Sequence, residues 1–122
     1  MKTFLYIFLG GGIGSVLRFY GSAFTQNWLK WYTFPIGTLF VNTIGCLLIG
    51  LFSAYFIKND PQGLKFLFIT GFCGGFTTFS TFSYETVILW QNQNYTTLFF
   101  YLILSLALGI LATILGLQLG RI

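Results

Sequence analysis

Apolar residues run through this chain in four long stretches, which cover residues 3–24, 33–57, 65–90 and 97–119. Each stretch matches the roughly 20 residues that a helix needs to cross the hydrocarbon core of a bilayer. The apolar positions are continuous and do not alternate with polar ones, which argues against a membrane β-barrel. The sequence therefore predicts an all-α integral membrane protein with four transmembrane helices.

Short polar segments at residues 25–32, 58–64 and 91–96 separate these stretches. Each is too short to fold alone, so we expect one four-helix domain over residues 1–122. The middle segment holds the turn-forming residues Asn59, Asp60, Pro61 and Gly63.

The N-terminus has two possible interpretations. Met1 and Lys2 followed by an apolar run could begin a secretory signal peptide. The glycines at positions 10–12 interrupt that run, however, and no clear cleavage site of small residues follows. We interpret the segment as the first span.

Composition strengthens the membrane assignment and argues against an enzyme. Hydrophobic residues make up 56% of the chain and charged residues 7%, where a soluble protein would have about 25% charged. The chain has no histidine, and its two acids are Asp60 and Glu85. One chain cannot build a carboxylate pair, an imidazole base or a zinc cluster from these. Cys46 and Cys73 both fall inside spans, where each is expected to be a small buried residue.

Glycines occur at the spacing of helix contacts. Small residues four apart let two helix backbones touch, and a small bundle of this kind is filled by its own side chains. A hydrated path then requires assembly, for which a two-fold dimer is the simplest closed form. The spaced pairs are Gly10 and Gly14, Gly71 and Gly75, and Gly116 and Gly120.

Positive charge gives an orientation. Counting basic residues near the span ends favours both termini on the cytoplasmic side. That side would carry Lys2, Lys58, Lys65 and Arg121, and the other Lys30 with Arg18.

Polar residues inside the second and third spans are the candidates for function, because polar groups in lipid are costly. In the second span, Thr38 and Asn42 lie four apart on one helix face, and Asn42 offers two N–H donors. Either Asn42 joins helices by a hydrogen bond, or it binds a ligand.

The third span contains an unusual polar segment near its middle. Gly74 and Gly75 precede Thr77 and Thr78, and we expect the two glycines to unwind the helix there. Carbonyls freed by such a break need new partners in lipid. Just beyond it, Phe79 and Phe82 share a face, with Ser80, Thr81, Ser83 and Glu85 nearby.

Three motifs give the chain a resemblance to a known family. They are Gly-Gly-Ile-Gly at 11–14 with Arg18, Gly-Thr-Leu-Phe-Val-Asn at 37–42, and Gly-Gly-Phe-Thr-Thr-Phe-Ser-Thr-Phe-Ser at 74–83. With them the whole chain resembles the CrcB/Fluc fluoride channels.

The resemblance implies a passive, fluoride-specific channel in the inner membrane of a prokaryotic cell, which lowers cytoplasmic fluoride and its toxicity. It also implies an antiparallel, dual-topology homodimer in the lipid bilayer, with two fluoride pathways and one structural, non-transported sodium ion at its centre. The charge count favoured one orientation and does not predict this arrangement.

Family positions also imply site residues. The backbone carbonyls of Gly74 and Thr77 would bind the sodium ion, and four carbonyl oxygens from two copies suit such a hard cation. Fluoride loses strong hydration on leaving water, so it needs replacement donors or positive ring edges, without a fixed charge that would trap it. The implied fluoride pathway is lined by Asn42, Phe79 and Phe82, with a hydroxyl track of Ser80, Thr81, Tyr101 and Ser105.

Two charged residues keep open roles. Glu85, near one end of the third span, either caps a helix, pairs with a base, or helps protons and fluoride to meet at the pore mouth. Arg18 is either a structural anchor or a residue of a polar vestibule.

The main alternative is a small four-span, dimeric multidrug/proton antiporter. Such an exporter needs a membrane carboxylate in its first span, which here holds Arg18 and no acid. A non-transporting assembly subunit would leave the polar third span unexplained.

Overall fold

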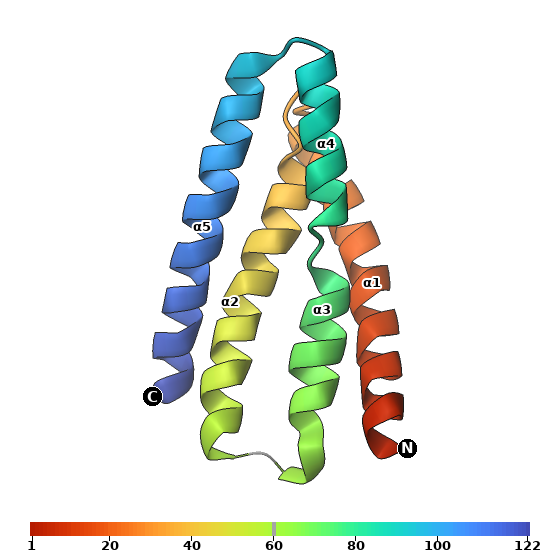
Figure 1. The fold of residues 1–122 in the computed structure, drawn as a ribbon, viewed down its shortest axis with the longest axis vertical. Helices are drawn as coiled ribbons and strands as arrows, with labels where there is room; N and C mark the ends of the chain where they lie inside the picture. The colour runs from red at the N-terminus through yellow and green to blue at the C-terminus, as the bar shows by residue number, and fades with distance from the viewer. Residues whose placement is uncertain (60) are drawn as a thin grey trace.

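Four helical spans lie side by side in the structure, a computed structural model that describes residues 1–59 and 61–122 (Figure 1). Three of the spans are continuous helices: α1 (Lys2–Leu29), α2 (Ile36–Lys58) and α5 (Tyr95–Arg121). All four are long and apolar enough to cross a membrane, as predicted. Asp60, which the sequence analysis assigned to a loop, lies outside the described residues.

The third span is divided into several pieces. It begins with a 3₁₀ turn, η1 (Pro61–Gly63), and a π-helix, η2 (Phe66–Cys73), and continues through α3 (Gly74–Phe76) and α4 (Ser80–Gln91). Residues 77–79 between α3 and α4 are not helical, and Figure 1 shows the ribbon uncoiling there. The predicted break near the middle of the span is confirmed.

The position of the break differs from the prediction. Gly74 and Gly75 were expected to unwind the helix, but both are helical, and Gly74 has ordinary α-helical angles. The backbone becomes extended only at Thr77, with φ −89° and ψ 156°. The prediction that the glycines themselves unwind is therefore wrong. Gly75 serves close packing instead, because a Cβ there would overlap the backbone of Gly11.

Two of the helices extend beyond their predicted spans, whereas α2 begins at Ile36, three residues inside its predicted range of 33–57. α1 continues to Leu29, so residues 25–29, which were expected in a loop, are helical. Thr25 adapts to this position because its hydroxyl donates to the Gly21 carbonyl one turn earlier, at 2.8 Å. α5 likewise starts and ends two residues outside its predicted bounds of 97–119. Hydropathy thus located the apolar part of each helix, and polar residues such as Thr25 continue the helix beyond that part.

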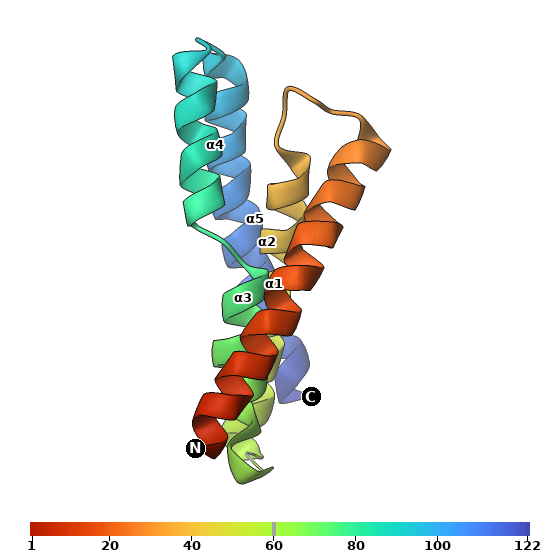
Figure 2. The same ribbon diagram turned by 90° about the vertical axis from the view of Figure 1, so that its right-hand side faces the viewer.

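The spans pack as two close pairs. α1 lies along η2 and α3, and α2 lies along α5. A Cβ on Gly10 would overlap the carbonyl oxygen of Leu67, and one on Gly116 would overlap that of Leu47. These backbones touch, as the glycine spacing predicted. Figure 2 shows α1 inclined to the other spans, so that its C-terminal half diverges from α4.

The buried core is small and lies where α2, α4 and α5 meet. It is formed by Leu39, Leu89 and Tyr101, and the tyrosine is fully buried. Large apolar side chains such as Phe8, Phe19 and Ile110 cover the outside and are more than half exposed. An apolar exterior of this extent suits lipid as the surrounding medium.

Candidate functional site

Asn42 of α2 binds the broken segment of the third span through its side-chain amide. Its Nδ2 donates to the Thr78 carbonyl at 2.9 Å, and its Oδ1 accepts from the Thr78 amide at 2.8 Å. In a continuous helix that amide would donate to the carbonyl of Gly74, four residues earlier. A side chain from the neighbouring helix therefore replaces one rung of the helical ladder.

A second rung is replaced by the hydroxyl of Thr78. The Thr81 amide donates to Thr78 Oγ1 at 3.1 Å, although in a continuous helix it would donate to the Thr77 carbonyl. These two replacements leave the carbonyls of Gly74 and Thr77, the expected sodium ligands, without their helical donors. Carbonyl oxygens are also the ligand type that a hard cation prefers.

Arg18 of α1 reaches the same break. Its Nε donates to the Gly75 carbonyl at 3.0 Å, and the Ser15 hydroxyl is 3.5 Å from the same oxygen. The arginine thus satisfies a backbone acceptor next to the break. An unpaired charge inside a membrane is costly, and carbonyl partners of this kind reduce that cost.

A pocket of about 310 Å³ lies against the break, between α2, α4 and α5. It is lined by four of the residues expected in the fluoride pathway: Asn42, Phe79, Phe82 and Ser105. We call it the aromatic pocket. Its remaining lining is Leu39, Thr43, Cys46, Ile49, Thr77, Thr78, Leu106 and Gly109.

The aromatic pocket contains hydrogen-bond capacity that the chain does not use. The buried hydroxyl oxygen of Ser105 has no partner among the described residues. Asn42 Nδ2 carries two N–H groups, and within the described chain its acceptor is the Thr78 carbonyl alone. Polar groups inside a protein normally have hydrogen-bond partners. The Ser105 hydroxyl and the second N–H of Asn42 lack one within the described chain, so both are available to a ligand.

Two phenyl rings border the aromatic pocket. Phe79 and Phe82 have ring centroids 5.8 Å apart at an angle of 39°. Phe82 also packs against Tyr101, with centroids 5.1 Å apart, whereas Phe79 is 78% exposed. One ring is therefore fixed by the core, and the other projects from the subunit at the break.

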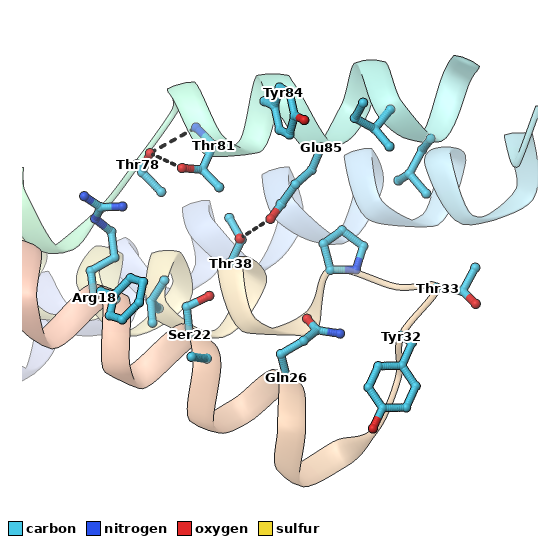
Figure 3. A pocket seen from close by; sticks show the side chains of 16 residues that line it. Arg18, Ser22, Gln26, Tyr32, Thr33, Thr38, Thr78, Thr81, Tyr84 and Glu85 are labelled. Atoms are coloured by element: carbon cyan, nitrogen blue, oxygen red, sulfur yellow. Dashed lines mark hydrogen bonds between the residues drawn. The ribbon is translucent and has the colours of Figure 1, made fainter. Parts of the chain in front are cut away.

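A larger pocket of about 540 Å³ lies on the other side of the break, between α1, α2 and α4. We call it the polar pocket. Figure 3 shows the Arg18 guanidinium next to Thr78, and the Glu85 side chain extending from α4 toward Thr38 of α2. Its other labelled lining residues are Ser22, Gln26, Tyr32, Thr33, Thr81 and Tyr84.

Glu85 is held by two hydroxyl groups. Thr38 Oγ1 donates to its Oε1 at 2.7 Å, and the Tyr101 hydroxyl donates to its Oε2 at 2.6 Å. Of the three roles considered for Glu85, these contacts match neither a helix cap nor pairing with a base. They tie α2, α4 and α5 together around one carboxyl group.

The expected pathway residues thus fall into two neighbouring groups. Thr81, Arg18 and Glu85 line the polar pocket, and the residues named above line the aromatic pocket. Thr78 lines both. Two members of the expected hydroxyl track lie apart from the pocket linings: Tyr101 is buried behind Glu85, and the Ser80 hydroxyl is 3.2 Å from that of Thr78.

Comparison with known proteins identifies the family. The model of the family described as "CrcB-like protein, Camphor Resistance (CrcB)" matches residues 5–117. The chain belongs to the CrcB family.

Relatives of the chain in this family carry a functional name. A protein of Flavobacterium psychrophilum, named "Fluoride-specific ion channel FluC", is 46% identical over 123 residues, which cover 99% of this chain and 98% of that protein. Proteins of the same name from Phocaeicola vulgatus and a Hydrogenobaculum species are 46% and 40% identical. They match 99% and 97% of this chain, and 100% and 97% of their own lengths.

The part matched by the CrcB family model includes contacts that sequence reasoning missed. Gln26 Nε2 donates to the carbonyls of Trp31 and Phe34, and Gln26 Oε1 accepts from the Gly37 amide at 3.1 Å. One side chain thus fixes the loop between α1 and α2 and binds an amide in the first turn of α2. No local pattern indicated this role, because residues 25–32 were expected to form a loop.

The partners of Glu85 were also missed in part. Thr38 was noted only for lying on the face of Asn42, and its bond to Glu85 spans 47 positions of sequence. No local pattern predicts such a contact.

Proposed function

We propose that this protein is a fluoride channel that passively exports fluoride across the inner membrane of a prokaryotic cell, as an antiparallel, dual-topology homodimer. The names of its CrcB relatives support the substrate. The observation that carries the proposal is the aromatic pocket, where Asn42, Ser105 and Phe82 from three helices and Phe79 from the break surround one cavity.

The pocket offers fluoride replacements for water. Fluoride is a small anion that accepts hydrogen bonds, and it loses much free energy when it is stripped of water without new donors. The second N–H of Asn42 and the hydroxyl of Ser105 can donate to it, and the positive edges of Phe79 and Phe82 can face it. With no basic side chain lining this pocket, fluoride binds weakly enough to leave.

A second copy would complete the pathway. Phe79 projects from the subunit, and a Cβ on Gly74 would meet nothing within 4 Å. The face of the break is therefore open for another chain, and a two-fold assembly would bring two breaks together. In an antiparallel pair the two pathways would run along the interface.

A structural sodium ion at the dimer centre fits the chemistry of the break. The carbonyls of Gly74 and Thr77 have lost their helical donors to Asn42 and Thr78. Two copies would present four such oxygens, which repel one another unless a hard cation lies among them. The ion would supply positive charge that holds the two breaks together.

Passive export is sufficient for the biological role. Hydrogen fluoride is a weak acid, so its neutral form would cross the membrane and dissociate in the cytoplasm, and the inside-negative membrane potential would then drive the anion outward. A proton-coupled drug exporter would need a carboxylate that exchanges protons with its path. Both oxygens of Glu85 already accept hydroxyl donors, which disfavours that alternative.

Liposomes loaded with potassium fluoride or potassium chloride test the proposal, with valinomycin present so that potassium can leave as counter-charge. Reconstituted protein should release fluoride, as measured with a fluoride electrode, and should retain chloride over the same period. Chloride release at a comparable rate would overturn the proposed selectivity, and retention of both ions would overturn the channel.

A further inference from the structure

One turn of α2 holds two residues that contact the break. Asn42 bonds to both backbone groups of Thr78. Three residues later, Gly45 is buried against Thr77: a Cβ on Gly45 would overlap Thr77 Cγ2 and lie 3.3 Å from Phe76 Cδ1. Residues three apart share a helix face, so one face of α2 fits the backbone and the side chain of the break together.

The side chain of Thr77 cannot turn away from α2 without loss. Its hydroxyl donates to the Cys73 carbonyl at 2.8 Å, which fixes the direction of its methyl group toward Gly45. Rotation about the Cα–Cβ bond would break this hydrogen bond. A methyl group added at Gly45 would therefore displace the backbone of Thr77, whose carbonyl is one of the two freed oxygens.

We infer that Asn42 and Gly45 are positioning residues for a cation site made by the carbonyls of Gly74 and Thr77. Asn42 removes the helical donor of the Gly74 carbonyl, and Gly45 fixes the position of Thr77. α2 then determines the affinity for the cation, although none of its atoms is a ligand. This inference rests on the sodium site of the proposed function.

The test measures how sodium stabilises the purified protein. Thermal unfolding is followed while sodium chloride replaces N-methyl-D-glucamine chloride at constant ionic strength, and the sodium concentration for half-maximal stabilisation is recorded. Gly45→Ala should raise this concentration by about tenfold or more. Thr77→Ser supplies the background for a double variant, because serine keeps the hydroxyl and lacks the methyl.

Two further variants separate positioning from general packing. In Gly45→Ala/Thr77→Ser the new methyl occupies the space of the lost one, so the half-maximal concentration should return toward the wild-type value. Gly12→Ala is the matched control, since a Cβ there meets nothing within 4 Å. It should leave the sodium dependence unchanged.

Each outcome decides the inference. If Gly45→Ala lowers the unfolding temperature equally at all sodium concentrations, or if Thr77→Ser fails to restore the sodium dependence, Gly45 serves packing alone and the inference is wrong. If Gly45→Ala does not fold, Asn42→Ala carries the test: an unchanged half-maximal concentration in that variant overturns the inference. If sodium does not stabilise the wild type, the proposed sodium site itself is wrong. The proposed fluoride channel is tested independently, by fluoride release from liposomes.

Discussion

Asn42 has two roles within one side chain, since it holds the break and offers a second N–H to the aromatic pocket. Asn42→Asp keeps an acceptor for the Thr78 amide but places a carboxylate against the Thr78 carbonyl and the path of an anion. Charge repulsion in a medium of low dielectric constant is strong, so we expect fluoride release from liposomes to stop.

The same variant should still fold and dimerise, which size-exclusion chromatography can check. It should be less stable by about 1–3 kcal/mol because the half-buried carbonyl of Thr78 loses its donor. Wild-type fluoride release in Asn42→Asp would show that Asn42 serves only to join the helices.

Variants of the two phenylalanines at the aromatic pocket should differ in their effects on fluoride release and on stability. Phe79→Ile and Phe82→Ile each remove a ring edge, and both should reduce fluoride release by a large factor. Because Phe79 is 78% exposed and Phe82 packs on Tyr101, unfolding of the subunit should be affected more by Phe82→Ile. Undiminished release in both variants would return the rings to a packing role.

Tyr101 should matter for stability through Glu85. Tyr101→Phe leaves Glu85 Oε2 without its donor beside the fully buried ring, which costs about 1–3 kcal/mol. Thermal unfolding in detergent should shift down by several degrees. Tyr20→Phe is the control, because Tyr20 is 66% exposed, and equal shifts in both variants would contradict the role of the bond.

At the residue level, local motifs of the sequence contain more of the residues that line the aromatic pocket than of the contacts that hold Glu85. Asn42, Phe79 and Phe82 lie in continuous motifs, and the structure gathers them around one cavity with Ser105. The contacts of Glu85 with Thr38 and Tyr101 join three helices. Such contacts depend on how the helices pack, which hydropathy and local motifs do not encode.

Among the helices, the contact of α1 with α3 is sensitive to added volume. Gly75→Ala would place a methyl group on the backbone of Gly11, and backbone cannot move aside as a flexible side chain can. We expect a loss of about 1–3 kcal/mol, as for other overpacked sites, measured by thermal unfolding. Gly12→Ala should have little effect, and an equal loss in that variant would contradict the close approach.

The spans followed from hydropathy because each is nearly continuous in apolar residues. The break in the third span could be predicted from the sequence only in part, since a glycine pair can indicate either unwinding or close packing. Here Gly75 packs against α1. The helix opens at Thr77 because the amides of Thr78 and Thr81 donate to the Asn42 side chain and the Thr78 hydroxyl instead of to helical carbonyls. A break determined by a neighbouring helix cannot be located from its own segment. The π-helix η2 also had no signal in the apolar pattern.

At the scale of the whole molecule, the open face at Gly74 is where the proposed partner would bind. Gly74→Leu should leave the subunit folded, because nothing in the described chain lies within 4 Å of the new Cβ. It should weaken the dimer, which cross-linking in liposomes at low protein density would report. An undiminished dimer in this variant would mean that two copies meet elsewhere.

The orientation of the chain in the membrane stays a prediction from its charge distribution. Both termini lie at one end of the bundle in Figure 1, as an even number of spans requires. The basic residues favour the cytoplasm for that end, whereas the proposed dimer needs both orientations. Labelling of single cysteines placed at the termini, from each side of the membrane, would distinguish a single orientation from an equal mixture.

Electrogenic release of fluoride is the most direct test of a passive fluoride channel. Liposomes that contain the protein and potassium fluoride are diluted into potassium-free medium, and a fluoride electrode follows release before and after addition of valinomycin. A passive channel should release little fluoride until valinomycin lets potassium leave as counter-charge, and then release it rapidly, with no such response in Asn42→Asp. Rapid release without valinomycin that instead follows an imposed pH gradient would show proton-coupled exchange and contradict the account.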